Sequence, residues 1–203
     1  MKIILMFESF FINLLKEKIF LGILVGAIFE YLFPPVPSEI VLPLGGYFIS
    51  INKLGIFGLL YGILFASVGT TVGAILYYYL ALSLGRKFIE KYGKKVYIDK
   101  RKLKAAEKWF KKHGKMAVLI GRLIPGIREL ISIPAGILKM NLSEYIFYTF
   151  VGANIWSTIL VSSGYFFGKT PLPLLQQLSS FIFFIILLSL ISYLIFKKIL
   201  TKS

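Results

Sequence analysis

Cysteine is absent from this sequence, and histidine occurs once, as His113. The lack of cysteine excludes disulfide bonds and thiolate metal sites. A membrane phosphatase with a histidine nucleophile and a histidine acid needs at least two histidines, and a His-rich metal site is excluded in the same way. Neither a Walker loop nor a dinucleotide-binding fingerprint is present. We therefore expect no enzymatic activity, no metal site and no cofactor.

Charged residues are scarce, and acids are the scarcer kind. Charged residues make up 16% of the chain, against about 25% in soluble globular domains. Hydrophobic residues reach 57% and the mean hydropathy is +0.80. The 9 acidic residues are outnumbered by 24 lysines and arginines. This composition predicts a membrane protein with several spanning segments, in the inner (plasma) membrane of the cell.

The basic residues are concentrated in one segment. Of the 24 lysines and arginines, 13 lie between Arg86 and Lys115, and uncharged apolar stretches lie on both sides. A basic run can bind nucleic acid. The apolar flanks instead favour a cytoplasmic loop that obeys the positive-inside rule and lies on anionic lipid headgroups. We expect a basic cytoplasmic loop over 86–115 and no nucleic-acid partner.

Uncharged stretches long enough to span a bilayer occur elsewhere, since a spanning helix needs about 20 apolar residues. We expect spanning helices over 54–85 and 145–168, and a third helix with a basic tail over 171–203. With the basic loop inside the cell, the C-terminus is then also cytoplasmic. Residues 1–18 lack the cleavage site of a signal peptide and are expected to form an amphipathic, interfacial segment.

Two further apolar segments, 19–50 and 116–140, are interrupted by proline, glycine and charged residues. Proline cannot continue a helix. Non-helical backbone at membrane depth is tolerated only where protein buries it or where it lines a polar cavity. Each segment is therefore predicted to be a re-entrant helical hairpin.

The two interrupted segments share a pattern of spacing. Three residues recur at the same intervals, namely Pro35, Glu39 and Gly46 in the first segment and Pro125, Glu129 and Gly136 in the second. With the basic loop inside, the first hairpin enters from outside and the second from the cytoplasm, as in transporters with inverted repeats. The predicted fold is an all-α membrane protein, a polytopic helical bundle with two opposed re-entrant helical hairpins in an inverted repeat.

Charge at membrane depth is the strongest functional signal. Glu30 and Glu39 come from the first hairpin, and Arg122 and Arg128 from the second. Buried charges in a membrane are costly and usually functional. An arginine fork suits phosphate, and a carboxylate in a low-dielectric site can take up a proton near neutral pH. These residues predict a proton-coupled phosphate site, and the alternative is a set of static ion pairs that lock the hairpins together.

The same residues resemble the DedA family, whose defining region is also called the SNARE-associated or VTT domain. The resemblance covers about residues 20 to 170. The matching residues are Glu30, Pro35-Val36-Pro37-Ser38-Glu39, Gly45-Gly46, Gly121-Arg122-Leu123-Ile124-Pro125-Gly126-Ile127-Arg128, Pro134-Ala135-Gly136, Met140, Asn154 and Trp156. Ser38 is a departure, because the family often has glycine before the acid.

The resemblance implies that the family's essential acids correspond to Glu30 and Glu39, and its essential arginines to Arg122 and Arg128. Supporting positions of the pattern are Pro35, Pro37, Gly46, Pro125, Gly126, Glu129, Gly136, Asn154 and Trp156. It also implies membrane homeostasis that depends on the proton-motive force. Members have been described as translocating undecaprenyl phosphate, and eukaryotic relatives as scrambling phospholipids.

The functional expectation is a membrane transporter that flips a phosphate-bearing lipid, such as undecaprenyl phosphate, under the proton-motive force and so supports envelope homeostasis. Its partners would be membrane lipids, either a polyprenyl phosphate or a phospholipid, and protons. An energy-independent phospholipid scramblase and a non-transporting scaffold or assembly factor are the alternatives. The sequence leaves open whether two copies form a homodimer.

Overall fold

Helices account for the regular structure of the part of this chain that is described. The computed structural model describes residues 13–32, 38–92, 100–124, 128 and 130–167, and these residues contain no strand. A short helical stretch, 13–17, comes first. The helices that follow are α2 (Ile19–Leu32), α3 (Ser38–Ile51), α4 (Gly55–Tyr92), α5 (Lys100–His113), α6 (Met116–Arg122), α7 (Ser132–Ile137) and α8 (Leu142–Phe167).

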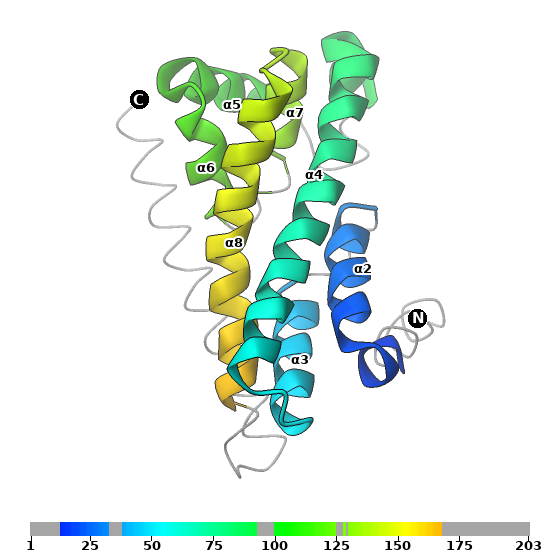
Figure 1. Cartoon of the computed structure of the whole chain (residues 1–203). Helices are drawn as coiled ribbons and strands as arrows, with labels where there is room; N and C mark the ends of the chain where they lie inside the picture. The colour runs from blue at the N-terminus through cyan, green and yellow to red at the C-terminus, as the bar shows by residue number, and fades with distance from the viewer. Residues whose placement is uncertain (1–12, 33–37, 93–99, 125–127, 129, 168–203) are drawn as a thin grey trace.

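Two long helices, α4 and α8, form the axis of the bundle (Figure 1). Gly55–Gly85 and Leu142–Phe167 are both long and apolar enough to cross a membrane, and they lie where the sequence predicts spanning helices. Gly85 has φ 69 and ψ 174 and interrupts the helical path of α4. Glycine adopts this positive φ without the strain that a Cβ would cause. The third predicted span, 171–203, lies outside the described residues.

One face of α4 is apolar and exposed along the whole candidate span. Large side chains recur on it every three or four residues, and they are Ile56, Phe57, Leu60, Tyr61, Leu64, Val68, Val72, Leu76, Tyr79, Leu80 and Leu84. Phe57 is 73% exposed. A soluble protein rarely leaves so extended an apolar patch open to water, whereas lipid chains would cover it at no cost.

The interrupted segments are helix pairs that come from opposite ends of the bundle. In Figure 1, α2 and α3 lie beside the lower half of α4, whereas α6 and α7 lie beside its upper half. The predicted segment 19–50 corresponds to α2 and α3, and the segment 116–140 contains α6 and α7. The end of α2 meets the end of α6, because Arg122 in the last turn of α6 donates a hydrogen bond to the hydroxyl of Tyr31 in the last turn of α2.

Each helix pair contacts both long helices in the same way. The first helix of a pair packs on the long helix that follows it, α2 on α4 and α6 on α8. The second helix packs on the other long helix, α3 on α8 and α7 on α4. Glycine permits each close approach, because a Cβ at Gly69, Gly46, Gly152 or Gly136 would collide with α2, α8, α6 or α4 respectively. Gly46 and Gly136, predicted as supporting residues, thus act at helix contacts.

The basic segment 86–115 contains more structure than the loop that the sequence predicts. The helix α4 continues to Tyr92, and α5 occupies 100–113. Phe110 and Glu107 are buried on the inner side of α5, whereas Lys108, Lys111 and Lys112 are exposed. This helix lies across the end of the bundle where α6 and α7 begin and end (Figure 1).

Candidate functional site

Arg128 lies between two carboxylates where the helix pairs meet. Its Nη2 is 2.6 Å from Glu30 Oε1 and 2.8 Å from Glu39 Oε1. Glu30 comes from the last turn of α2, and Glu39 from the first turn of α3. An acid in the first turn of a helix is favoured by the positive end of the helix dipole. Two acids from the first pair and one arginine from the second are thus brought together, as the sequence predicts.

The three charged side chains are largely shielded from solvent. The exposed fractions of the side chains are 8% for Arg128, 7% for Glu30 and 18% for Glu39. Removing ions from water costs several kcal/mol each, and close pairing with good geometry offsets that cost. One guanidinium nitrogen serves both carboxylates, so any other anion that binds there must compete with the acids.

The aromatic ring of Trp156 forms one side of this charge cluster. The Arg128 guanidinium carbon lies 4.9 Å from the ring centroid of Trp156, within the range of a cation–π interaction. Trp156 is 6% exposed, and its indole N–H is buried without a hydrogen-bond partner among the described residues. Near it, Asn154 Nδ2 donates a hydrogen bond of 3.3 Å to Ser67 Oγ and so joins α8 to α4. Trp156 thus carries a buried donor without a partner among the described residues, and its ring lies against Arg128.

Arg122 has a different environment from Arg128. Its Nη1 donates to the hydroxyl of Tyr31 and, at 2.7 Å, to the carbonyl oxygen of Arg128. Its Nη2 donates to Ser132 Oγ at 2.8 Å and to the Tyr145 hydroxyl at 3.0 Å. Arg122 is 2% exposed. This side chain connects the end of α6, the start of α7, α2 and α8, and so fixes the break that carries Arg128.

Tyr145 extends the Arg122 network into α4. Its hydroxyl donates to the backbone carbonyl of Ala74 at 3.0 Å while it accepts from Arg122. The Tyr145 ring also stacks on Tyr78, with centroids 4.8 Å apart. Together with Tyr31 and Ser132, this tyrosine was missed by sequence reasoning. A buried guanidinium needs several acceptors, but a hydroxyl 91 positions away, as for Tyr31 and Arg122, has no signal in the spacing of one sequence.

The remaining predicted site residues are placed as follows. Five of them lie outside the described residues, and they are Pro35, Pro37, Pro125, Gly126 and Glu129. Gly136 is buried on α7 against the backbone of α4 at Tyr78. Among the described residues, no three His, Cys, Asp or Glu side chains come together in a way that could hold a metal ion.

Comparison with known proteins gives consistent matches. The profile of the VTT domain matches residues 36–166. The chain is 36% identical over 148 residues to Undecaprenyl phosphate transporter A of Bacillus subtilis, covering 73% of this chain and 71% of that protein. It is 33% identical over 147 residues to the protein of the same name from Staphylococcus aureus, covering 70% and 71%. An "Alkaline phosphatase-like protein" of Lactococcus lactis is 34% identical over 162 residues, covering 77% and 74%. No solved structure matches.

Proposed function

The chain belongs to the VTT-domain family of membrane proteins, and from this premise we propose that it moves a phosphate-bearing lipid across the membrane in a cycle coupled to protons. Two similar proteins are named undecaprenyl phosphate transporter A, which favours a polyprenyl phosphate as the substrate. The observation that carries the proposal is the shared nitrogen of Arg128, which holds Glu30 and Glu39 in a buried site. A phosphate monoester is the kind of anion for which a guanidinium fork is suited.

Competition for Arg128 supplies the coupling step. While both carboxylates are charged, they occupy the guanidinium and exclude a second anion. Protonation of Glu30 or Glu39 removes a negative charge from the cluster and frees donors of Arg128 for the phosphate oxygens. Return of the proton to water restores the ion pair and expels the phosphate. Proton uptake thus accompanies phosphate binding, and a proton gradient drives the cycle.

The remaining residues of the site position these three. Arg122, at the end of α6, donates to the Arg128 carbonyl oxygen and to Ser132 at the start of α7, so that it fixes the backbone from which Arg128 projects. We assign Arg122 this positioning role in addition to its predicted role as a phosphate ligand. The indole N–H of Trp156 is a neutral donor beside the guanidinium and would bind a phosphate oxygen when the lipid arrives.

An inverted repeat of two re-entrant hairpins is the proposed frame for this cycle. The reciprocal packing supports it, because α2 contacts α4 as α6 contacts α8, while α3 and α7 each pack on the opposite long helix. The end that carries α5 is assigned to the cytoplasm by its lysines. The ends of α2 and α6, which the hydrogen bond from Arg122 to Tyr31 joins, then meet at the midplane, where transporters of this design bind their substrates.

The test is transport by the purified full chain in liposomes, with a fluorescent polyprenyl phosphate and an imposed pH gradient. The wild-type protein should move the lipid faster with the gradient than without it. Arg128→Lys should retain little transport activity, because the point charge of a lysine cannot replace the planar guanidinium fork. Glu17→Gln, at an exposed acid outside the site, is the control and should behave as wild type.

Two outcomes would contradict the proposal. Equal transport with and without the gradient would indicate an energy-independent scramblase. Absence of transport by a folded wild-type protein, together with normal behaviour of cells that carry Arg128→Lys, would indicate a scaffold whose charge cluster only locks the helices.

A further inference from the structure

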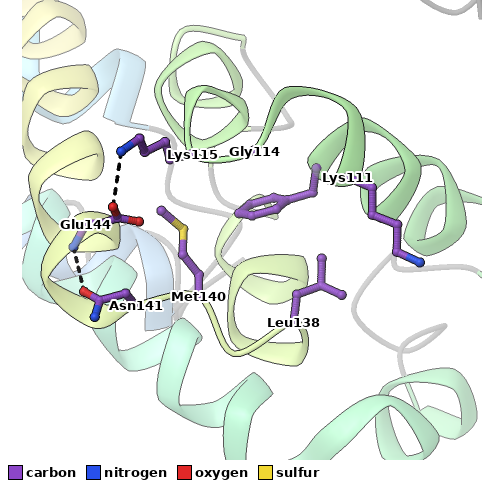
Figure 2. Close-up of a pocket in the computed structure, with 8 residues that line it drawn as sticks. Lys111, Gly114, Lys115, Leu138, Met140, Asn141 and Glu144 are labelled. Atoms are coloured by element: carbon purple, nitrogen blue, oxygen red, sulfur yellow. Dashed lines mark hydrogen bonds and ion pairs between the residues drawn. The ribbon is translucent and has the colours of Figure 1, made fainter.

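A groove of about 460 Å³ lies between the end of α5 and the connection of α7 to α8, and none of its lining residues belongs to the charge cluster. Its base is apolar and is formed by Phe110, Leu138 and Met140. Lys111 and Lys115 lie at its rim. In Figure 2, Lys115 is on one side of Met140 and Leu138, and Lys111 is on the other. The groove thus combines an apolar base with cations at both ends.

The start of a candidate span beside the groove is the position at which lipid headgroups are expected. The candidate span of α8 begins at Leu142, directly after the groove residue Asn141. The groove residue Met140 is joined to α4, because its carbonyl oxygen accepts a hydrogen bond of 2.5 Å from the Tyr78 hydroxyl. The helix α5, which carries the exposed Lys108, Lys111 and Lys112, lies across this end of the bundle (Figure 1). A ligand here would meet apolar chains on one side and water on the other.

We propose that this groove binds the headgroup of an anionic glycerophospholipid, as a site separate from the transport site at Arg128. The lysines attract the phosphate, and the apolar base accommodates the glycerol and the first methylene groups. Neither half alone selects this ligand: a free phosphate would not need Phe110 and Leu138, and a neutral lipid would not need the lysines. Bound lipid would hold α5 against the α7–α8 connection.

The two lysines differ in their readiness to bind. Lys115 Nζ is 3.2 Å from Glu144 Oε1, so its charge is partly neutralised, as Figure 2 shows. Lys111 is exposed and has no ion pair among the described residues. Lys111 is therefore the primary phosphate ligand. Glu144 competes with the lipid for Lys115, and removing its charge should strengthen binding.

The chain offers a matched control for this assignment. Lys112 is the neighbour of Lys111 on α5, has the same charge and is also exposed, but it does not line the groove. A diffuse attraction between α5 and an anionic membrane would depend on both lysines equally. A defined site depends on Lys111 and not on Lys112. The Lys111→Ala protein should fold, because the Lys111 side chain is exposed.

The experiment is native mass spectrometry of the full-length protein in detergent, titrated with phosphatidylglycerol and with phosphatidylcholine. We expect tighter binding of phosphatidylglycerol. Lys111→Ala should weaken it about tenfold, the loss expected for one charge-assisted hydrogen bond, whereas Lys112→Ala should change it less than about twofold. Glu144→Gln should strengthen it, and excess glycerol phosphate should not displace the lipid.

Three results would overturn the proposal. Equal losses in Lys111→Ala and Lys112→Ala would show a diffuse attraction. Equal binding of phosphatidylglycerol and phosphatidylcholine would show that the net charge of the lipid headgroup does not determine binding. Displacement by glycerol phosphate would show a site for a soluble phosphate, in which the apolar base has no role.

Discussion

Removal of Arg128 should destabilise the protein strongly, and a second substitution should reverse part of that loss. In Arg128→Ala, Glu30 and Glu39 lose the guanidinium nitrogen that lies 2.6 and 2.8 Å from their oxygens. Breaking a buried ion pair by removing one partner costs about 3–5 kcal/mol. The upper part of that range applies here, because two carboxylates are left close together with an exposed fraction of 7% and 18%.

The second substitution tests the cause of the loss. In Arg128→Ala with Glu30→Gln, one of the two repelling charges is gone, so about half of the lost stability should return. The assay is thermal unfolding of the purified protein in detergent. A loss of about 3–5 kcal/mol corresponds to a fall in Tm of about 10 °C for a chain of this size. Lys53→Ala, at an exposed turn between α3 and α4, is the control and should leave Tm unchanged.

The reasoning would be refuted by an Arg128→Ala protein as stable as wild type. That result would mean that water or another cation replaces the guanidinium as a partner of the two carboxylates. A double variant no more stable than Arg128→Ala would also refute it, because the loss would then come from packing against Trp156 and not from charge.

Three other predictions address the network, the aromatic contact and the orientation. Tyr145→Phe removes an acceptor of Arg122 and a donor to Ala74, and it should cost about 1–3 kcal/mol in thermal unfolding, whereas Tyr79→Phe, at a 46% exposed ring, should cost nothing measurable. Trp156→Leu should lower stability by about 0.5–2 kcal/mol more than Trp156→Phe, since only phenylalanine keeps a ring under Arg128. The natural chain lacks cysteine, so Lys112→Cys should react with a membrane-impermeant reagent only from the cytoplasmic side and Lys53→Cys only from outside; the opposite pattern would invert the orientation.

A pH dependence is expected at the rim of the lipid groove. The pKa of Lys115 is raised above its ordinary value of 10.5, mainly by the hydrogen bond to Glu144 and secondly by the electrostatic attraction of the Glu144 carboxylate. A raised pKa in the folded protein means that the pair stabilises the fold below the lysine's ordinary pKa and loses that effect as pH rises through the folded value. The difference in Tm between wild type and Glu144→Gln should therefore shrink above pH 10.5. A Tm difference between the two proteins that does not change with pH would contradict an origin in the Lys115–Glu144 ion pair.

Much of the fold could be predicted from charge and its absence. Uncharged stretches predict α4 and α8 because the membrane excludes charge over the length of a span. Proline predicts the breaks after α2 and α6, because it removes a backbone donor and its ring disfavours the helix interior. Pro43 is an exception, since it lies inside α3. The prediction of membership in the DedA family, on the motif around Arg122 and Arg128, is confirmed by the match to the VTT domain.

Other features could not be predicted from one sequence. The segment that contains α5 reads as a loop because its lysines dominate the composition, while the burial of Phe110 depends on contacts with other helices. Serine and tyrosine are common in apolar helices, so Ser132, Tyr145 and Tyr31 gave no reason to place them around Arg122. The different partners of Arg122 and Arg128 arise from the tertiary fold, which residue type and spacing do not encode.

The most direct test of competition for Arg128 is the affinity of the protein for the phosphate lipid when one of the two carboxylates has been made neutral. Binding of a polyprenyl phosphate to Glu39→Gln and to wild type should be measured on the same preparations at neutral pH. If the acids and the phosphate compete for Arg128, Glu39→Gln binds the lipid more tightly than wild type, and its transport rate responds less to an imposed pH gradient. Weaker binding by Glu39→Gln, or a full response to the gradient, would contradict the account.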